Sequence, residues 1–297
     1  MNIVVVDPSR VVLRIVSSFL APQGHLVSCF TDSRQALARI VADAEVDALI
    51  TSLEVQPVSG LELCWFTRVL AQERRPIYII AMSSNRNSRS LSEALDSGAD
   101  DFISKPPVIE ELNARLRAGH RLISLEKELI RQADTDPLTG QRNRRAFLDR
   151  LHKAVDGSKQ ADRLSFVMFD IDHFKSINDR FGHDVGDIAI QTVARLAAEE
   201  AEVVGRLGGE EFGILLPNQS QVEAYDLANR LRVRLSALRI KALRHQLHLT
   251  CSFGVSTWTE GDKAEALMKR ADIALYQAKA EGRNRVVAAP HPTGTSR

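Results

Sequence analysis

The feature that most constrains this chain is a pair of short apolar runs separated by two glycines. Residues 203–207 form the first run and residues 212–216 the second, with Gly208 and Gly209 between them. Glycine adopts the positive φ angles of tight turns without steric cost from a Cβ atom, so the pattern predicts a β-hairpin. Two acids, Glu210 and Glu211, follow directly. The hairpin places two carboxylates beside a glycine turn that a phosphate can approach closely. The alternative is a surface hairpin with two solvated acids.

Three further segments accompany this hairpin. In chain order they are residues 136–145 (DPLTGQRNRR), residues 166–187 (FVMFDIDHFKSINDRFGHDVGD) and residues 270–284 (RADIALYQAKAEGRN). In this order and spacing, the four segments resemble the GGDEF-domain diguanylate cyclases over roughly residues 134–290. The resemblance implies an α+β, nucleotidyl-cyclase-like domain that condenses two GTP into cyclic di-3′,5′-GMP and two pyrophosphates.

The metal site is expected where a buried strand meets the hairpin. Asp170 ends an apolar run, and Glu210 lies in the turn beside it if the two strands pair. These carboxylates and the main-chain carbonyl of Ile171 offer the hard oxygen ligands that Mg²⁺ prefers. The resemblance implies two Mg²⁺ ions per active site, with Mn²⁺ as the alternative ion. It also places Glu210 or Glu211 near the 3′-hydroxyl that loses a proton, and we favour Glu210 as the base. The expected catalytic residues are therefore Asp170, Glu210 and Glu211.

The triphosphate is expected to bind near the loop His173-Phe174-Lys175. Backbone N–H groups at a strand-to-helix turn bind anions, and Lys175 adds a positive charge. Lys279 and Arg283 resemble the family's additional triphosphate ligands, although ordinary surface charge is the alternative for both. Gly208 and Gly209 complete the expected phosphate contacts.

The guanine base is expected to contact Asn178 and Asp187, which match the family's guanine-binding positions. A carboxylate accepts hydrogen bonds from guanine N1–H and N2–H₂ together, whereas adenine offers no such pair of donors on that edge. The substrate is therefore expected to be GTP rather than ATP.

The first ~110 residues alternate short apolar runs with segments of helical length. The runs, expected to be strands, are residues 3–6, 26–30, 48–50, 77–81 and 102–103. The expected helices are residues 11–20, 33–41, 61–71 and 88–97. This alternation predicts an α/β fold with a parallel sheet covered on both faces. Over about residues 1–120 the pattern resembles the receiver domain of response regulators, a flavodoxin-like fold with a five-stranded parallel sheet.

This second resemblance breaks down at the phosphorylation site of the receiver family. The phosphoacceptor Asp of the family corresponds to Ser52, and its acid pair on the first strand is reduced to Asp7. The switch hydroxyl corresponds to Ser83 and the signalling lysine to Lys105. Phosphoryl transfer needs a carboxylate nucleophile and a Mg²⁺ held by several carboxylates. We expect a degenerate receiver, not phosphorylated, that serves in dimerisation or partner binding. The alternative is that a neighbouring acid, Glu54, takes over part of the role.

One long helix is predicted between the two domains, over residues 108–133. Leu122, Leu125 and Leu129 fit a short coiled-coil seam. The alternative is that this segment is the last receiver helix and packs on the receiver sheet. Both interpretations hold if the first half of the helix packs on the sheet and the second half projects as a linker. The expected domains are a receiver-like domain (1–120), a linker helix overlapping it (108–135), a GGDEF domain (134–290) and a tail (291–297). In the GGDEF domain we expect helices mostly on one face of the sheet and a single strand over residues 247–255.

Composition excludes several classes of protein. The chain has 297 residues, 44% of them hydrophobic, and a net charge of +1, which gives no argument for binding nucleic acid. No apolar run approaches the ~18 residues that a membrane helix needs, and residues 1–7 do not resemble a signal peptide. Three scattered cysteines predict a cytoplasmic protein without disulfides.

The resemblance also implies partners. One domain binds one GTP and offers half a site, so two copies must face each other as a homodimer. An unidentified protein partner of the receiver is a further expectation. The alternative functions are a catalytically silent GGDEF scaffold or GTP sensor, and a transcriptional output protein, for which no helix-turn-helix pattern is present. Glu199 and Glu202 occupy the positions where many relatives have the Arg-x-x-Asp of a product-binding inhibitory site.

Overall fold

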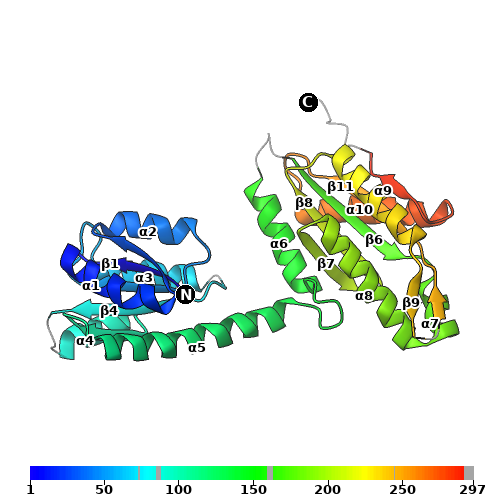
Figure 1. Cartoon of the computed structure of the whole chain (residues 1–297). Helices are drawn as coiled ribbons and strands as arrows, with labels where there is room; N and C mark the ends of the chain where they lie inside the picture. The colour runs from blue at the N-terminus through cyan, green and yellow to red at the C-terminus, as the bar shows by residue number, and fades with distance from the viewer. Residues whose placement is uncertain (73, 85–87, 159–162, 244, 291–297) are drawn as a thin grey trace, which may run out of the picture. The chain divides into compact units, whose positions relative to one another are not determined.

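A computed structural model describes residues 1–72, 74–84, 88–158, 163–243 and 245–290. The chain divides into two compact units, Met1–Arg131 and Gln132–Arg297, each with its own sheet (Figure 1). The expected tail, residues 291–297, lies outside the described residues. Within the described residues, no helix is long and apolar enough to span a lipid bilayer.

The first unit is a five-stranded parallel sheet in the order β2-β1-β3-β4-β5, as predicted. Its strands are β1 Asn2–Val6, β2 Leu26–Phe30, β3 Ala48–Ser52, β4 Tyr78–Ser83 and β5 Asp101–Ser104. Its helices are α1 Arg10–Leu20, the short 3₁₀ helix η1 Ala21–Gln23, α2 Ser33–Ala42, α3 Gly60–Ala71, α4 Ser88–Asp96 and α5 Ile109–Asp134. One core packs α1 and α5 on the sheet and the other packs α2 and α3, so both faces are covered. The receiver fold is confirmed.

Local sequence explains where these helices begin. Asp32 accepts hydrogen bonds from the first backbone N–H groups of α2, and Ser59 forms a capping box with Glu62 at the start of α3. At Gly60 a Cβ atom would lie 2.1 Å from the carbonyl oxygen of Ser52. This glycine lets α3 begin tightly against the end of β3, and it fixes the loop between them.

Helix α5 has two different halves. Its N-terminal part, as far as Ile123, buries one face against the receiver sheet through Leu112, Leu116, Gly119 and Ile123. Its second half exposes the predicted seam leucines Leu122, Leu125 and Leu129. The apolar positions of the helix therefore divide between a buried face and exposed positions, and the coiled-coil seam stays a prediction.

The second unit is a five-stranded sheet in the order β12-β11-β6-β8-β7, with a separate two-stranded hairpin. Its strands are β6 Leu164–Ile171, β7 Val203–Gly208, β8 Glu211–Pro217, β9 Ile240–Ala242, β10 His245–Leu247, β11 Cys251–Thr257 and β12 Val286–Ala288. Its helices are α6 Arg144–Gly157, α7 Phe174–Phe181, α8 His183–Glu200, α9 Gln221–Ala237 and α10 Ala264–Ala280. The expected α+β class is confirmed.

Two details of the expected second domain are wrong. Helices cover both faces of its sheet: α8 and α9 pack on one face and α6 and α10 on the other. The central strand β6 is buried at every position, so each of its faces needs a cover. The expected strand 247–255 is also interrupted: Leu247 is the last residue of β10, which pairs with β9 in a hairpin, and β11 begins only at Cys251. Its turn contains Leu243 at φ 53°, a conformation that leucine rarely adopts and that no sequence signal indicates.

Candidate active site

The hairpin that organises the site forms as predicted, with one adjustment. Strands β7 and β8 are antiparallel, and Gly209 and Glu210 occupy the turn between them, with Gly209 at φ 51°. Gly208 is the last residue of β7 and pairs with Glu211, so only the second glycine lies in the turn. Strand β8 also pairs with β6, and this register places Asp170 opposite Glu211. The hairpin therefore brings its two acids to the end of the central strand.

Asp170 is a buried carboxylate with a cation beside it. Its exposed fraction is 6%, and the Lys279 ammonium nitrogen lies 3.0 Å from its Oδ2. Burial raises the pKa of Asp170 to about 6, against the opposing effect of Lys279 and with the help of the negative charges of Glu210 and Glu211. Three acids and one lysine from three separate segments, β6, the β7–β8 hairpin and α10, thus gather at one sheet edge.

The donor set at this edge fits a divalent ion that arrives with its substrate. Among the described residues, no group of three or more His, Cys, Asp and Glu side chains forms a complete metal site. Mg²⁺ in nucleotide sites is usually held by one or two carboxylates plus substrate phosphates. Asp170, Glu210 and the carbonyl of Ile171 match that smaller set. The buried Asp170 carboxylate already pairs with a cation in this structure, the Lys279 ammonium.

The expected phosphate loop lies at the start of α7. His173 precedes the helix at φ 57° and makes no side-chain cap to it. Phe174 and Lys175 are the first helical residues, and the Lys175 side chain is exposed. An uncapped helix N-terminus beside an exposed lysine is suited to an anion.

Asn178 lies on α7 against the first turn of α8. A Cβ atom at Gly186 would be 1.9 Å from Asn178 Oδ1, so only glycine leaves room for this amide. Asn178 Oδ1 is buried and accepts no hydrogen bond from the described residues. Asp187, the next residue after Gly186, is exposed on α8. Asn178 Oδ1 therefore lies against Gly186, the residue that precedes Asp187. The structure thus brings the two residues expected to contact guanine close together.

A residue that sequence reasoning did not select fixes the other side of the site. Asp172 is 4% exposed and accepts hydrogen bonds from Thr250 Oγ1 and Ser252 Oγ, each at 2.7 Å, and from the backbone N–H of Asn284 at 3.0 Å. These contacts tie the end of β6 to the segment after α10, where Arg283 lies at φ 64°. The second acid of Asp-x-Asp is a structural anchor, and its spacing from Asp170 was the only sequence signal.

The four residues expected at the receiver site also lie together. The Lys105 ammonium nitrogen is 2.7 Å from Asp7 Oδ2 and 2.5 Å from Ser52 Oγ. Ser83 joins the group through Glu54, whose carboxylate accepts its hydroxyl hydrogen bond at 2.9 Å. Glu54 was considered only as an alternative from the sequence, and the structure places it among all the others.

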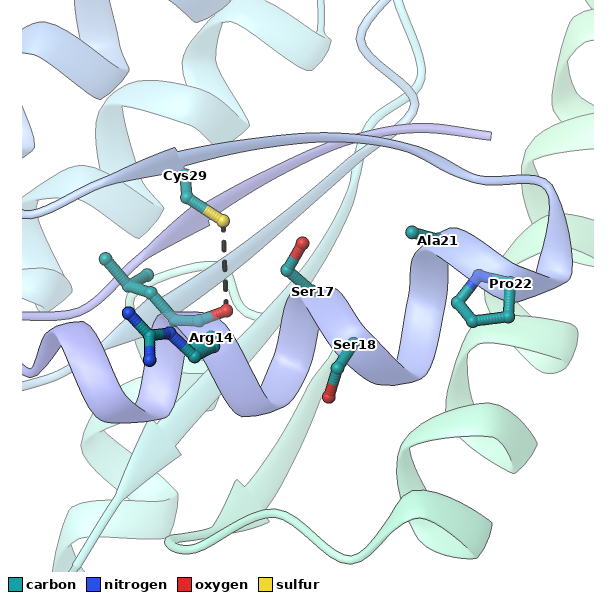
Figure 2. Close-up of a pocket in the computed structure, with 7 residues that line it drawn as sticks. Arg14, Ser17, Ser18, Ala21, Pro22 and Cys29 are labelled. Carbon is teal, nitrogen blue, oxygen red and sulfur yellow. Dashed lines mark hydrogen bonds between the residues drawn. The ribbon is translucent and has the colours of Figure 1, made fainter.

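A separate hollow on the first unit lies between α1 and β2. It is open, and it is lined by Arg14, Ser17, Ser18 and Cys29 among others (Figure 2). The Cys29 thiol donates to the carbonyl oxygen of Leu13 at 3.9 Å. Cys29 is an exposed residue, and the partial burial of its thiol raises the pKa, against a hydrogen bond from Ser17. A thiol with a raised pKa is a poor nucleophile. This hollow contains none of the expected site residues.

Two family models match the chain in adjacent segments. Residues 133–285 match "Diguanylate cyclase, GGDEF domain", and residues 3–117 match "Response regulator receiver domain". The first match covers slightly more than half of the chain.

Individual relatives share both parts or the second part alone. Response regulator PleD of Caulobacter vibrioides is 36% identical over 84% of this chain, which spans 58% of the length of PleD. The coiled coil and GGDEF domain of DgcB from Caulobacter crescentus, solved in complex with c-di-GMP, matches 60% of this chain and 99% of that chain at 33% identity and a TM-score of 0.56. Diguanylate cyclase SiaD of Pseudomonas aeruginosa, solved with its activator SiaC, matches 61% of this chain and 70% of that chain at 33% identity and a TM-score of 0.53.

Proposed function

Because the chain belongs to the GGDEF-domain diguanylate cyclases and has a response-regulator receiver domain, we propose that it condenses two GTP into cyclic di-3′,5′-GMP and two pyrophosphates. The observation that supports this most directly is the edge formed by Asp170, Glu210 and Glu211 beside Lys279. A silent scaffold would have no need of a buried, costly carboxylate at this position.

Substrate binding is proposed to use the groups that surround this edge. The backbone N–H groups at Phe174 and Lys175 and the Lys175 ammonium bind the triphosphate, together with Lys279 and Arg283. The glycines of the hairpin allow close approach of the phosphates. Asn178 Oδ1, buried and without a donor among the described residues, and Asp187 accept hydrogen bonds from guanine.

Asp170, Glu210 and the Ile171 carbonyl would hold Mg²⁺, with Mn²⁺ as an alternative and two ions per site. When bound, such ions would supply charge neutralisation for the leaving pyrophosphate and would lower the pKa of the 3′-hydroxyl. Glu210, in the turn, is proposed to accept the proton from that hydroxyl, with Glu211 as its neighbour on β8. Lys279 holds the charge of Asp170 until substrate arrives and then turns to the triphosphate.

Two chains are needed for one turnover. The second unit of each chain binds one GTP, so a two-fold homodimer must bring two 3′-hydroxyls to two α-phosphates. The receiver unit is proposed to support this dimer or to bind a protein partner. Acetyl phosphate and beryllofluoride are expected to leave turnover unchanged, because Ser52 provides no carboxylate for them. The cytoplasmic location stays a prediction from the three cysteines, all unpaired.

The test is to incubate the purified chain with GTP and Mg²⁺ and to measure cyclic di-GMP by chromatography. Glu210→Gln should lower the rate by about 10²–10⁴-fold, the range expected for loss of a general base. Glu260→Gln, which removes an exposed acid from the same unit, is the matched control and should change nothing. Absence of product from a folded dimer, or equal use of ATP, would contradict the proposal.

A further inference from the structure

The receiver unit contains a carboxylate whose partners come from three neighbouring strand ends. Glu54 lies in the loop after β3, and its Oε2 accepts hydrogen bonds from Ser52 Oγ at 2.6 Å and from the Lys105 ammonium at 2.9 Å. Its Oε1 accepts from Ser83 Oγ at 2.9 Å and from the backbone N–H of Ser84 at 3.4 Å. Each carboxylate oxygen therefore has two donors, which belong to the ends of β3 and β4 and to the segment after β5.

These donors form a site for an anion. A lysine ammonium, two hydroxyls and a backbone N–H converge on one small oxyanion, and the Lys105 side chain is only 10% exposed. Ser52 and Ser83 are 0% and 2% exposed. Their buried hydroxyl groups need a hydrogen-bond partner of this kind to offset the cost of burial. The site is thus complete when one carboxylate is present.

The loop that carries Glu54 is itself fixed. The backbone N–H of Glu54 donates to Ser52 Oγ at 3.1 Å, and that of Leu53 donates to the carbonyl oxygen of Met82 at 2.9 Å. On the other side of the loop, the buried Ser33 hydroxyl accepts from the N–H of Val58 at 2.8 Å. A side chain on a fixed loop loses little further freedom when it binds, so its effective concentration at the site is high.

The charges at this site disfavour the binding of a second anion. Glu54 and the fully buried Asp7, which lies 2.7 Å from the Lys105 ammonium, share this one cation. An incoming phosphoryl group, with a charge of about −1.5 to −2, would meet two carboxylates and donors that are already engaged.

We propose that Glu54 is a tethered ligand that permanently fills the anion site of the receiver unit and holds Ser83, Ser84 and Lys105 in one arrangement without phosphorylation. Hydrogen bonds from Ser52, Lys105 and Ser83 outweigh the effect of burial and lower the pKa of Glu54 to about 2, so the ligand stays ionised in neutral solution. The inference concerns the first unit alone and does not depend on cyclase activity.

Chemical rescue tests this inference. Glu54→Ala removes the ligand and leaves its donors, and Glu45→Ala removes an exposed acid from the same unit as a matched control. Hydrogen exchange of the full-length chain, measured by mass spectrometry on peptides covering residues 48–54 and 78–84, should be about 10-fold faster in Glu54→Ala only. Sodium acetate at about 0.2 M, compared with sodium chloride at equal ionic strength, should restore most of the protection in Glu54→Ala and leave the wild type and Glu45→Ala unchanged.

Three results would overturn the inference. The first is unchanged exchange in Glu54→Ala, which would mean that the carboxylate fills no site. The second is an acetate response in the wild type as large as in the variant, and the third is no acetate response in the variant. If Glu54→Ala prevents folding, Glu54→Gln decides the matter, because the amide keeps the shape and loses the charge. In Glu54→Gln, the strand ends should be less protected from hydrogen exchange than in the wild type. Equal protection in the two proteins would contradict an anionic ligand.

Discussion

The Arg206 guanidinium lies 3.2 Å from both carboxylate oxygens of Asp136, and its Nε donates to the carbonyl oxygen of Gly209 at 2.8 Å. Asp136 in turn accepts from the N–H and hydroxyl of Thr139, so the segment that follows α5 is folded around it. The backbone of Arg142 pairs with β7 on both sides of Gly205. The turn that presents Glu210 is therefore held by its own strand and by the segment after α5.

Arg206→Lys should lower turnover by about 10-fold with little change in thermal stability. Lysine keeps the charge but cannot donate to Asp136 and Gly209 together, so the position of Glu210 becomes less defined. Steady-state kinetics should show the loss in kcat more than in KM. Arg150→Lys, an exposed position on α6, is the control. Equal kcat in both variants would show that the bridge does not position the turn.

Asp170→Asn should abolish measurable turnover and leave the fold intact. The carboxylate is buried beside Glu210 and Glu211, so removing its charge relieves like-charge repulsion, while the freed Lys279 is partly exposed and can be hydrated. We expect a melting temperature within a few degrees of the wild type and a rate at least about 10³-fold lower. A large fall in melting temperature would instead assign Asp170 a structural role.

Much of the fold was predictable because the patterns are local. The five receiver strands follow from apolar runs of strand length, and the hairpin follows from its glycines. The placement of two helices on the second face of the GGDEF sheet was missed because the apolar side chains of α10 resemble any buried helix face. Helix α10 can lie on that face because Gly254 of β11 lets it approach the sheet closely. A Cβ atom at Gly254 would lie 2.1 Å from the carbonyl oxygen of Ala271.

The site was predictable in its residue types and less so in its partners. Motif spacing selected Asp170 and Glu210, and their assigned roles stay predictions. The pairing of Lys279 with Asp170 and the anchoring role of Asp172 depend on side chains from segments about 80 to 110 residues apart. Glu54 could be proposed from the sequence as an alternative to the missing carboxylate at Ser52, but its contacts with Ser83 and Lys105 required the strand ends to be placed around it.

Product inhibition through the site next to the hairpin should be weak. Glu199 lies 2.7 Å from Arg234 and 2.6 Å from Arg195, and Glu200 lies 2.5 Å from Arg234. A cluster whose arginines already bind carboxylates, at a place that lacks the family's own arginine, offers little to a dianionic dinucleotide. Cyclic di-GMP added to a steady-state assay should compete weakly with GTP. Potent non-competitive inhibition would contradict this expectation.

The receiver unit should lose part of its stability in acid through Glu54. The folded-state pKa of about 2 lies below the ordinary value of 4.5, so the ionised form stabilises the fold above pH 4.5 and this contribution disappears as pH falls toward 2. Because 45% of the side chain is exposed and Asp7 competes for Lys105, we expect only about 1 kcal/mol. Urea unfolding of Glu54→Gln and the wild type should differ at pH 7, differ less below pH 4.5 and converge near pH 2, while Glu45→Gln should match the wild type throughout.

The last prediction concerns the exposed leucines of α5. Leu125 and Leu129 are 64% and 65% exposed and take no part in the receiver core, so replacing them should not unfold the unit. If these leucines form a seam between two copies, Leu125→Gln/Leu129→Gln should weaken the dimer. Activity should then fall about 10-fold or more at low protein concentration and recover as the concentration rises.

The matched control is Leu26→Gln/Val41→Gln, which removes equally exposed apolar side chains from β2 and α2. Sedimentation and turnover should be measured on the same samples, so that loss of dimer and loss of rate can be compared. Deleting residues 1–107 should have a similar effect, with much of the activity restored by fusing a strong parallel coiled coil ahead of Leu122. If the leucine variant stays fully active at nanomolar concentration while the control variant loses its dimer, copies of the chain associate through another surface of the receiver and not through α5.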